Sequence, residues 1–286
     1  MEALKYMNKK KITSGKVVYT ILKYAVVLLL TISMLVPFIW MVSASFKTNL
    51  EIFTFPIKWI PEVFHFENYT NVWERSNYPV LFINTVKLTV IITVLQLVTS
   101  TMAAYAFSKI KFPERDKLFL LYLATLMVPY QVVMIPQFSI IREMGLVNSH
   151  WSLILIQAFS PMGVFLIKQF FDGIPDELIE AARIDGLGDW GIYSKIMLPL
   201  SKSAMITSAI LTITSTWNDF LAPLIYLSDP DLYTIQLGLR NLTSQYTTEY
   251  GQIMAASVIS VIPILVIYCI FQNFFQEGLV SGAVKG

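Results

Sequence analysis

The sequence contains very few of the residues that form metal sites and disulfides. Its 286 residues include one cysteine, Cys269, and two histidines, His65 and His150. A single cysteine excludes an intrachain disulfide, and no cysteine and histidine cluster with metal-ligand spacing is present. We therefore expect no metal site, and the predicted spans also lack the histidine or carboxylate cluster that would suggest a membrane enzyme.

Charged residues are also scarce. They make up 14% of the chain, whereas soluble domains carry roughly 25%. The net charge of +2 is too small to suggest a nucleic-acid partner. Hydrophobic residues account for 55% of the sequence and the mean hydropathy is +0.61. So few charged residues cannot cover the surface of a soluble globular protein. The composition therefore indicates a membrane protein whose surface contacts lipid.

A phosphate-binding loop is missing as well. The pattern Gly-x-x-x-x-Gly-Lys-Ser/Thr occurs nowhere, and Gly15-Lys16 lacks both the upstream glycine and the following hydroxyl residue. We expect that this chain binds no cofactor itself. Any ATP hydrolysis connected with its function would belong to another polypeptide.

Long apolar runs predict an all-α polytopic membrane protein. Runs of roughly 20 apolar residues are long enough to cross the hydrocarbon core of a bilayer. We predict six transmembrane helices, at residues 17–46, 80–109, 117–140, 149–169, 204–227 and 252–275. The first follows Lys9-Lys10-Lys11, as in a signal peptide, but its apolar run exceeds the roughly 7–15 residues typical of one. An uncleaved helix is the better interpretation.

The distribution of lysine and arginine predicts the orientation. One side would carry the N-terminal tail and the second and fourth connections, which hold Lys5, Lys9, Lys10, Lys11, Lys16, Lys109, Lys111, Arg115, Lys117, Lys168, Arg183, Lys195 and Lys202. The other side has fewer: Lys47, Lys58, Arg75, Arg142 and Arg240. Basic residues favour the cytoplasmic side. Both termini are therefore predicted to be cytoplasmic.

Two regions follow from this topology. Residues 1–79 comprise the tail, the first helix and an external segment, and residues 80–286 comprise a core of five transmembrane helices. The external segment, residues 47–79, is rich in aromatic residues: Phe53, Phe55, Trp59, Phe64, Phe66, Tyr69 and Trp73. Either an ordered cap or a simple aromatic belt at the membrane interface explains this composition.

A polar stretch, residues 170–203, lies between two apolar blocks and before the last two spans. Pro175 suits a first helical position, acidic residues follow it, and Gly186 is suited to end the helix. A second short helix would then run to Pro199. The result is a helix–turn–helix with a face of small residues, Ala181-Ala182, which another protein can approach closely. An amphipathic connection lying on the inner leaflet is the alternative.

The same stretch resembles a known signature. Glu180-Ala181-Ala182-x-x-Asp185-Gly186, followed by Ile196-x-Leu198-Pro199-Leu200, is similar to the cytoplasmic loop of binding-protein-dependent ABC importer permeases. Other segments resemble sugar-importer permeases of the maltose-transporter kind: Pro37-Phe38-Ile39-Trp40-Met41, Ser45-Phe46-Lys47, Asn84-Thr85, Ala103-Ala104-Tyr105-Ala106-Phe107, Phe112-Pro113, Trp217-Asn218-Asp219-Phe220 and Gly282-Ala283-Val284-Lys285-Gly286. Leu187 and Ser203 depart from the pattern, in which a small residue and a proline are frequent.

The resemblance implies a function and a set of partners. Residues 170–203, which we call the coupling loop, would dock on an ATPase subunit through Glu180, Ala181, Ala182, Asp185, Gly186, Leu198 and Pro199. A second homologous permease, two ATPase subunits that use Mg-ATP, and an extracellular solute-binding protein would complete the importer. It would lie in a bacterial inner membrane and carry a sugar or oligosaccharide.

Polar residues inside the spans are candidates for the solute pathway, because such residues usually face a bundle interior or a cavity. The candidates are Asn84, Lys87, Gln96, Trp217, Asn218 and Asp219. Lys87 would alternatively snorkel to the outer surface, Asp219 would cap or gate, and Trp217 would pack against a neighbouring helix.

Two other functions are compatible with parts of the sequence. A glycerol-phosphate-type solute is possible within the same family. A stand-alone secondary transporter would require an internal repeat or broken helices around a midplane site, and neither is evident in the sequence.

Overall fold

Helices make up all the regular secondary structure of the described residues. A computed structural model describes residues 14–75, 77–242 and 249–283. The longer helices are α1 (Ser14–Ala44), α3 (Glu67–Arg75), α4 (Tyr78–Lys109), α5 (Arg115–Ala124), α6 (Tyr130–Glu143), α7 (His150–Gln157), α8 (Pro161–Asp172), α9 (Asp176–Ile184), α12 (Lys202–Trp217) and α15 (Tyr250–Ala283). Short elements are α2 (Asn49–Ile52), η1 (Thr125–Met127), α10 (Asp189–Ile192), η2 (Tyr193–Met197), α11 (Leu198–Leu200), α13 (Leu221–Tyr226), η3 (Pro230–Leu232) and α14 (Ile235–Asn241). The all-α prediction is confirmed.

Four segments are long and apolar enough to cross a membrane. They are Val18–Ala44, Tyr78–Lys109, His150–Asp172 and Tyr250–Gln272, and two bent helix pairs bring the possible number to six. These four match the predicted first, second, fourth and sixth spans. The predicted third and fifth spans differ from the structure, because neither is one straight helix.

The predicted third span is not one straight helix. Arg115–Met127 and Tyr130–Glu143 meet at an angle of 100°. Val128, between them, is extended, with φ −83° and ψ 115°. The ring of Pro129 disfavours a helical conformation for the residue before it, so the chain turns at this point.

The predicted fifth span is broken as well. α12 ends at Trp217, and a separate short helix, α13, begins at Leu221. Pro223 favours the break, because proline has no N–H to bond the carbonyl of residue 219 and its ring would clash with that carbonyl. The prediction of a continuous helix at residues 204–227 was therefore wrong. Broken helices, which were not evident in the sequence, are present in the structure.

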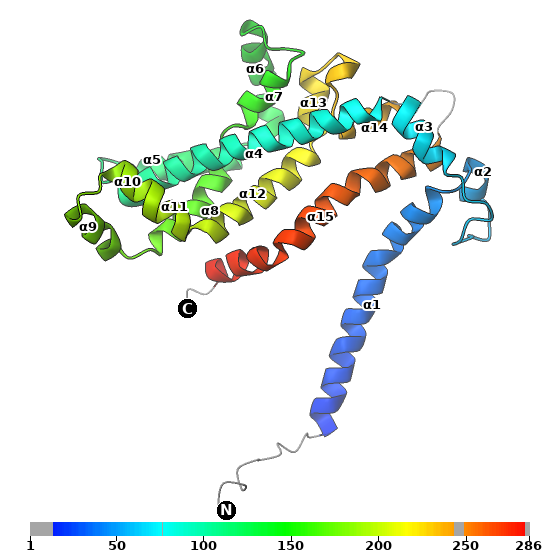
Figure 1. The fold of residues 1–286 in the computed structure, drawn as a ribbon, viewed down its shortest axis with the longest axis horizontal. Helices are drawn as coiled ribbons and strands as arrows, with labels where there is room; N and C mark the ends of the chain where they lie inside the picture. The colour runs from blue at the N-terminus through cyan, green and yellow to red at the C-terminus, as the bar shows by residue number, and fades with distance from the viewer. Residues whose placement is uncertain (1–13, 76, 243–248, 284–286) are drawn as a thin grey trace, which may run out of the picture.

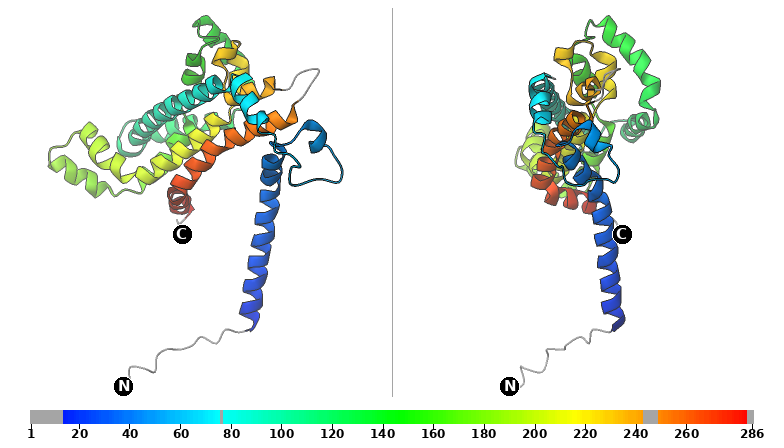
Figure 2. Two further views of the ribbon diagram at one scale, coloured as in Figure 1. Left: turned by 45° about the vertical axis from the view of Figure 1, so that its right-hand side comes forward. Right: turned by 90° about the vertical axis from the view of Figure 1, so that its right-hand side faces the viewer.

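The arrangement of the long helices places the coupling loop and the cap at opposite ends. α4 runs beside α8 and α12, and α15 lies along α12 (Figure 1). α9, α10 and α11 lie at one end of this bundle, whereas α2, α3 and α14 lie at the other (Figure 1). α1 leaves the bundle at the second end and diverges from it in each view (Figure 2). The most apolar part of α1 buries 0% of its residues inside the structure.

The segment at residues 47–79 is an ordered cap. It contains α2 and α3, and its aromatic rings contact one another, Trp40 of α1 and Phe46, which follows α1. The Phe46 ring centroid lies 5.6 Å from that of Phe64, 5.2 Å from that of Phe66 and 5.1 Å from that of Tyr69. Such edge and tilted contacts are favourable aromatic geometries. Of the two interpretations that the sequence left open, the structure supports the ordered cap.

Candidate functional site

The first helix of the coupling loop, α9, starts one residue later than the sequence suggested. Pro175 has φ −57° and ψ 136°, so it precedes the helix and Asp176 is the first helical residue. Asp176 and Glu177 occupy the first turn. Their carboxylates complement the positive end of the helix dipole, as predicted.

Gly186 ends α9 through two specific hydrogen bonds. Its φ of +84° lies in the left-handed region. The Leu187 amide donates to the Ala182 carbonyl (3.0 Å), and the Gly186 amide donates to the Arg183 carbonyl (3.0 Å). This pair of bonds is the Schellman motif, in which glycine is preferred because it has no Cβ to clash. The predicted helix stop at Gly186 is confirmed.

The two alanines of the Glu180–Gly186 motif lie on different faces of α9. Ala182 is 5% exposed and Ile179 is 6% exposed, and both pack into a core with Phe171, Ile192 and Met197. Ala181 is exposed. Successive side chains on a helix are about 100° apart, so one alanine fits against the core while its neighbour points outward. The prediction of a shared docking face for both alanines was wrong for Ala182.

The outer face of α9 combines acidic and apolar side chains. Glu180 and Asp185 are exposed, as the docking prediction requires. Leu178 is 47% exposed and Ile184 is 86% exposed, and sequence reasoning did not select either residue. Exposed large apolar side chains on a polar loop are a feature of protein contact surfaces. The sequence signal was the presence of these two large apolar residues in the short polar helix that ends at Gly186.

The second half of the coupling loop forms a helical segment anchored to α4. α10, η2 and α11 run from Asp189 to Leu200, and α12 then leaves at 76°. The Tyr193 hydroxyl lies 2.8 Å from the Thr101 hydroxyl of α4, and that contact is buried. Leu198 is half-buried and Pro199 is exposed near the bend. The second short helix ending near Pro199 was correctly predicted.

Two pathway candidates, Gln96 and Asp219, are joined through a residue that the sequence did not single out. Gln96 donates to the Gln157 carbonyl (2.7 Å), and the Gln157 side chain donates to the Asp219 carboxylate (2.8 Å). The carboxylate also accepts from the Ala222 amide at 3.2 Å. These contacts satisfy polar groups near the end of α7 and at the break after α12. A cavity of about 10 Å³ lies beside Asp219, which is about the volume that one water needs.

Four other candidates have different surroundings. Trp217 is 3% exposed and donates to the Ser260 carbonyl at 3.0 Å, so it packs between helices. Asn84 is 6% exposed and donates to the carbonyls of residues 231 and 233. Lys87 and Asn218 are exposed. The structure therefore gathers Gln96 and Asp219 in one partly buried network, and it does not bring the full candidate set together.

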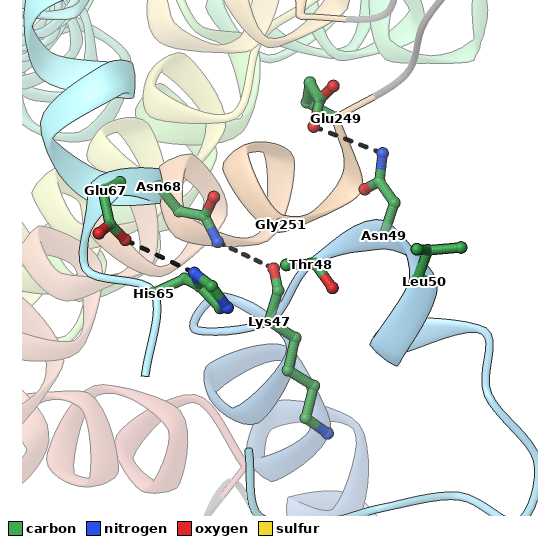
Figure 3. A pocket seen from close by; sticks show the side chains of 9 residues that line it. All are labelled: Lys47, Thr48, Asn49, Leu50, His65, Glu67, Asn68, Glu249 and Gly251. Carbon is green, nitrogen blue, oxygen red and sulfur yellow. Dashed lines mark hydrogen bonds and ion pairs between the residues drawn. The ribbon is translucent and has the colours of Figure 1, made fainter. Parts of the chain in front are cut away.

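A larger cavity of about 400 Å³ lies at the cap end, where the cap meets the start of α15 (Figure 3). Asn49 donates to the Glu249 carboxylate (3.4 Å), and Asn68 donates to the Lys47 carbonyl (3.0 Å). The Lys47 side chain points away from this cavity (Figure 3). Among the described residues, no group of three or more histidine, cysteine or acidic side chains has the arrangement of a metal site.

Comparison with known proteins identifies the family. A family model described as "Binding-protein-dependent transport system inner membrane component" matches residues 96–280, which include the coupling loop and both helix breaks. This chain belongs to that family. It is a multi-pass permease component of the bacterial inner membrane, and transport, not catalysis, is the activity of such components.

Individual relatives of this permease cover nearly all of it. The arabinooligosaccharides transport system permease protein of Halalkalibacterium halodurans is 36% identical, over 87% of this chain and 91% of the relative. The sn-glycerol-3-phosphate transport system permease protein of Yersinia pestis is 33% identical, over 84% of this chain and 88% of the relative.

A solved structure has the same fold as this permease. It is a bacterial ABC transporter involved in the import of alginate, an acidic polysaccharide, and it matches with a TM-score of 0.83 at 23% identity. The match covers 92% of this chain and 98% of that chain.

Proposed function

We propose that this permease transmits ATP-driven movement through α9 to the helices that carry a sugar or oligosaccharide across the membrane. The single observation that carries the proposal is the outward face of α9, with Glu180 and Ala181 exposed on a helix that is packed on its other side and closed by Gly186. A short helix that is fixed on one side, and that exposes both acidic and apolar side chains on the other, is suited to docking and to transmitting force.

The ATPase belongs to separate subunits. The sequence has no phosphate-binding loop, so Mg-ATP would be bound and hydrolysed by two partner subunits. The lysine-rich connections support a cytoplasmic position for the coupling loop and for both termini. α9 and the cap lie at opposite ends of the bundle, which is compatible with an ATPase on one side and a solute-binding protein on the other (Figure 1).

A second permease completes the proposed pathway. α1 diverges from its own bundle, and its apolar surface is unburied within this chain (Figure 2). A homologous subunit would cover part of that surface and lipid the remainder. Carbohydrate as the solute is supported by the relative that transports arabinooligosaccharides. A glycerol-phosphate solute is the alternative, supported by the second relative.

Two substitutions in the coupling loop test the proposed coupling between ATP hydrolysis and solute uptake. We expect Glu180→Lys and Gly186→Trp to leave membrane insertion intact while solute uptake falls by about tenfold or more relative to ATP hydrolysis, since each alters the docking surface or its bend. Glu143→Lys is the matched control, because Glu143 is an exposed glutamate at the end of α6, away from α9. Uptake at the normal rate in vesicles with either α9 variant would contradict the proposal.

The solute is tested separately from the coupling. Calorimetric titration of the cognate solute-binding protein should show binding of a sugar or oligosaccharide and none of sn-glycerol 3-phosphate. The reverse result would replace the proposed solute while leaving the coupling role of α9 unaffected.

A further inference from the structure

Lys109, the last residue of α4, has an ammonium group that points into the coupling loop. Its side chain is only 6% exposed. The ammonium donates to the Ile174 carbonyl at 2.8 Å and to the Asp176 carboxylate at 2.6 Å. A lysine is rarely buried to this extent unless its charge is paired. The Lys109 side chain is therefore held by these two acceptors and by burial of its methylene groups, and it does not extend to water.

The two acceptors lie on either side of Pro175, at the entry to α9. Ile174 is 7% exposed and belongs to the core beneath the loop. Asp176 is the first residue of α9, and its side chain is 77% exposed. The core packing of α9 already limits its rotation. Simultaneous bonds to the backbone before the helix and to its first side chain add two fixed points at its start, so they restrict the direction in which α9 leaves the connection.

The preceding residue of α4 makes a parallel contact to a different element. The Ser108 hydroxyl donates to the Asp172 carboxylate at 2.7 Å, and Lys168 donates to the other oxygen of that carboxylate at 2.7 Å. Asp172 is the last residue of α8. Two consecutive residues of α4 therefore hold the end of α8 and the start of α9 separately.

We infer that Lys109 is a positioning residue for coupling, which fixes the direction of α9 relative to α4. This inference rests on the proposed role of α9. α4 extends from the cap end to the coupling loop, so a fixed angle at Lys109 lets movement of α9 pass to a helix of 32 residues (Figure 1). The neighbouring Lys109 ammonium lowers the pKa of the Asp176 carboxyl, mainly through their hydrogen bond, so Asp176 remains a carboxylate at neutral pH.

Spin-label distances test this inference without requiring transport. One label is attached to Ile184→Cys, because Ile184 is 86% exposed on α9. The other is attached to Lys117→Cys, because the Lys117 side chain is 82% exposed on α5. The full chain carries Cys269→Ser, because the native cysteine is exposed. In Lys109→Met the label distances should spread over a wider range, and Lys109→Arg should restore a narrow distribution. Ser108→Ala is the matched control and should leave the distribution unchanged.

Uptake measurements give the second readout. Loss of a charge-assisted contact should reduce the correctly oriented population of α9, and hence uptake per ATP hydrolysed, by about tenfold in Lys109→Met. Binding of the ATPase should persist. Asp176→Asn keeps an acceptor but removes the ion pair, so it provides a second, milder perturbation that should give an intermediate distribution. An unchanged distance distribution in both Lys109→Met and Asp176→Asn would overturn the inference.

The same labels separate this inference from the proposed function. Adding the ATPase subunits to the chain with Lys109 intact should narrow or shift the distances, because α9 would be docked. If the ATPase has no effect while Lys109→Met still broadens the distribution, the docking role fails and the positioning role stands.

Discussion

Replacing Gly186 with alanine isolates the energetic contribution of one backbone conformation. A Cβ added at Gly186 would have no atom within 4 Å, so the substitution introduces no steric contact with a neighbouring residue. The cost arises from φ +84°, and a left-handed conformation costs a residue with a Cβ roughly 1–2 kcal/mol. Alanine also restricts the unfolded chain, which returns about 0.4–1 kcal/mol. We expect a net local destabilisation of about 1 kcal/mol.

Gly188 provides a matched control two residues away. A Cβ there would also meet no atom within 4 Å, but its backbone is extended, with φ −77° and ψ 172°. Alanine tolerates that conformation. Because Gly188 is the N-cap of α10, where glycine is preferred to alanine, any cost of Gly188→Ala should be confined to the start of α10 and should not reach α9.

Hydrogen exchange in lipid nanodiscs measures the difference. A loss of about 1 kcal/mol raises the population of the open form about fivefold. Amides of peptides that cover α9 and Leu187 should exchange correspondingly faster in Gly186→Ala, while peptides from α4 should not change. Equal exchange in Gly186→Ala and Gly188→Ala would refute the argument that the left-handed cap stabilises α9.

Two further predictions concern the cap and the partly buried polar network of Gln96, Gln157 and Asp219. In Gly251→Ala the new Cβ would clash with the Lys47 carbonyl oxygen and lie 2.6 Å from the Asn68 side-chain amide nitrogen. We therefore expect faster proteolysis of the cap, and wild-type resistance to proteolysis would contradict this contact. Asp219→Ala should reduce uptake more than Asn218→Ala, because it leaves the Gln157 amide without a charged partner, a loss of about 1.5–3 kcal/mol. Asn218 bonds the Thr214 carbonyl of its own helix and is exposed. Uptake unchanged in both variants would exclude the pair from the pathway.

Local signals in the sequence predicted the class of the protein and most of its long helices. The apolar runs of α1, α4 and α15 are continuous, and a bilayer favours helices because every backbone polar group is satisfied within the segment. The stop at Gly186 was also predictable, since it depends on the conformational freedom of one residue. The resemblance to the family was also visible in the sequence, because it depends on the order of residues in the coupling loop and on no tertiary contact.

The broken helices show where local reasoning was incomplete. Pro129 and Pro223 were visible in the sequence, yet Pro37 and Pro263 lie inside the uninterrupted helices α1 and α15. Proline alone does not decide whether a membrane helix breaks, because neighbouring groups can satisfy the carbonyls it leaves free. At the second break, Asp219 accepts a hydrogen bond from the Gln157 side chain, and this partner comes from a distant part of the sequence.

The sequence by itself determined that this protein spans a membrane, carries a helical coupling loop and belongs with importer permeases, because those properties depend on composition, spacing and residue order. Only the tertiary structure decided that Ala182 faces the core while Ala181 faces outward. It also decided that Lys109 reaches the entry of α9, 65 positions further along the chain at Ile174. The physical reason is that burial and charge pairing depend on which helices meet, and side chains far apart in sequence determine those meetings.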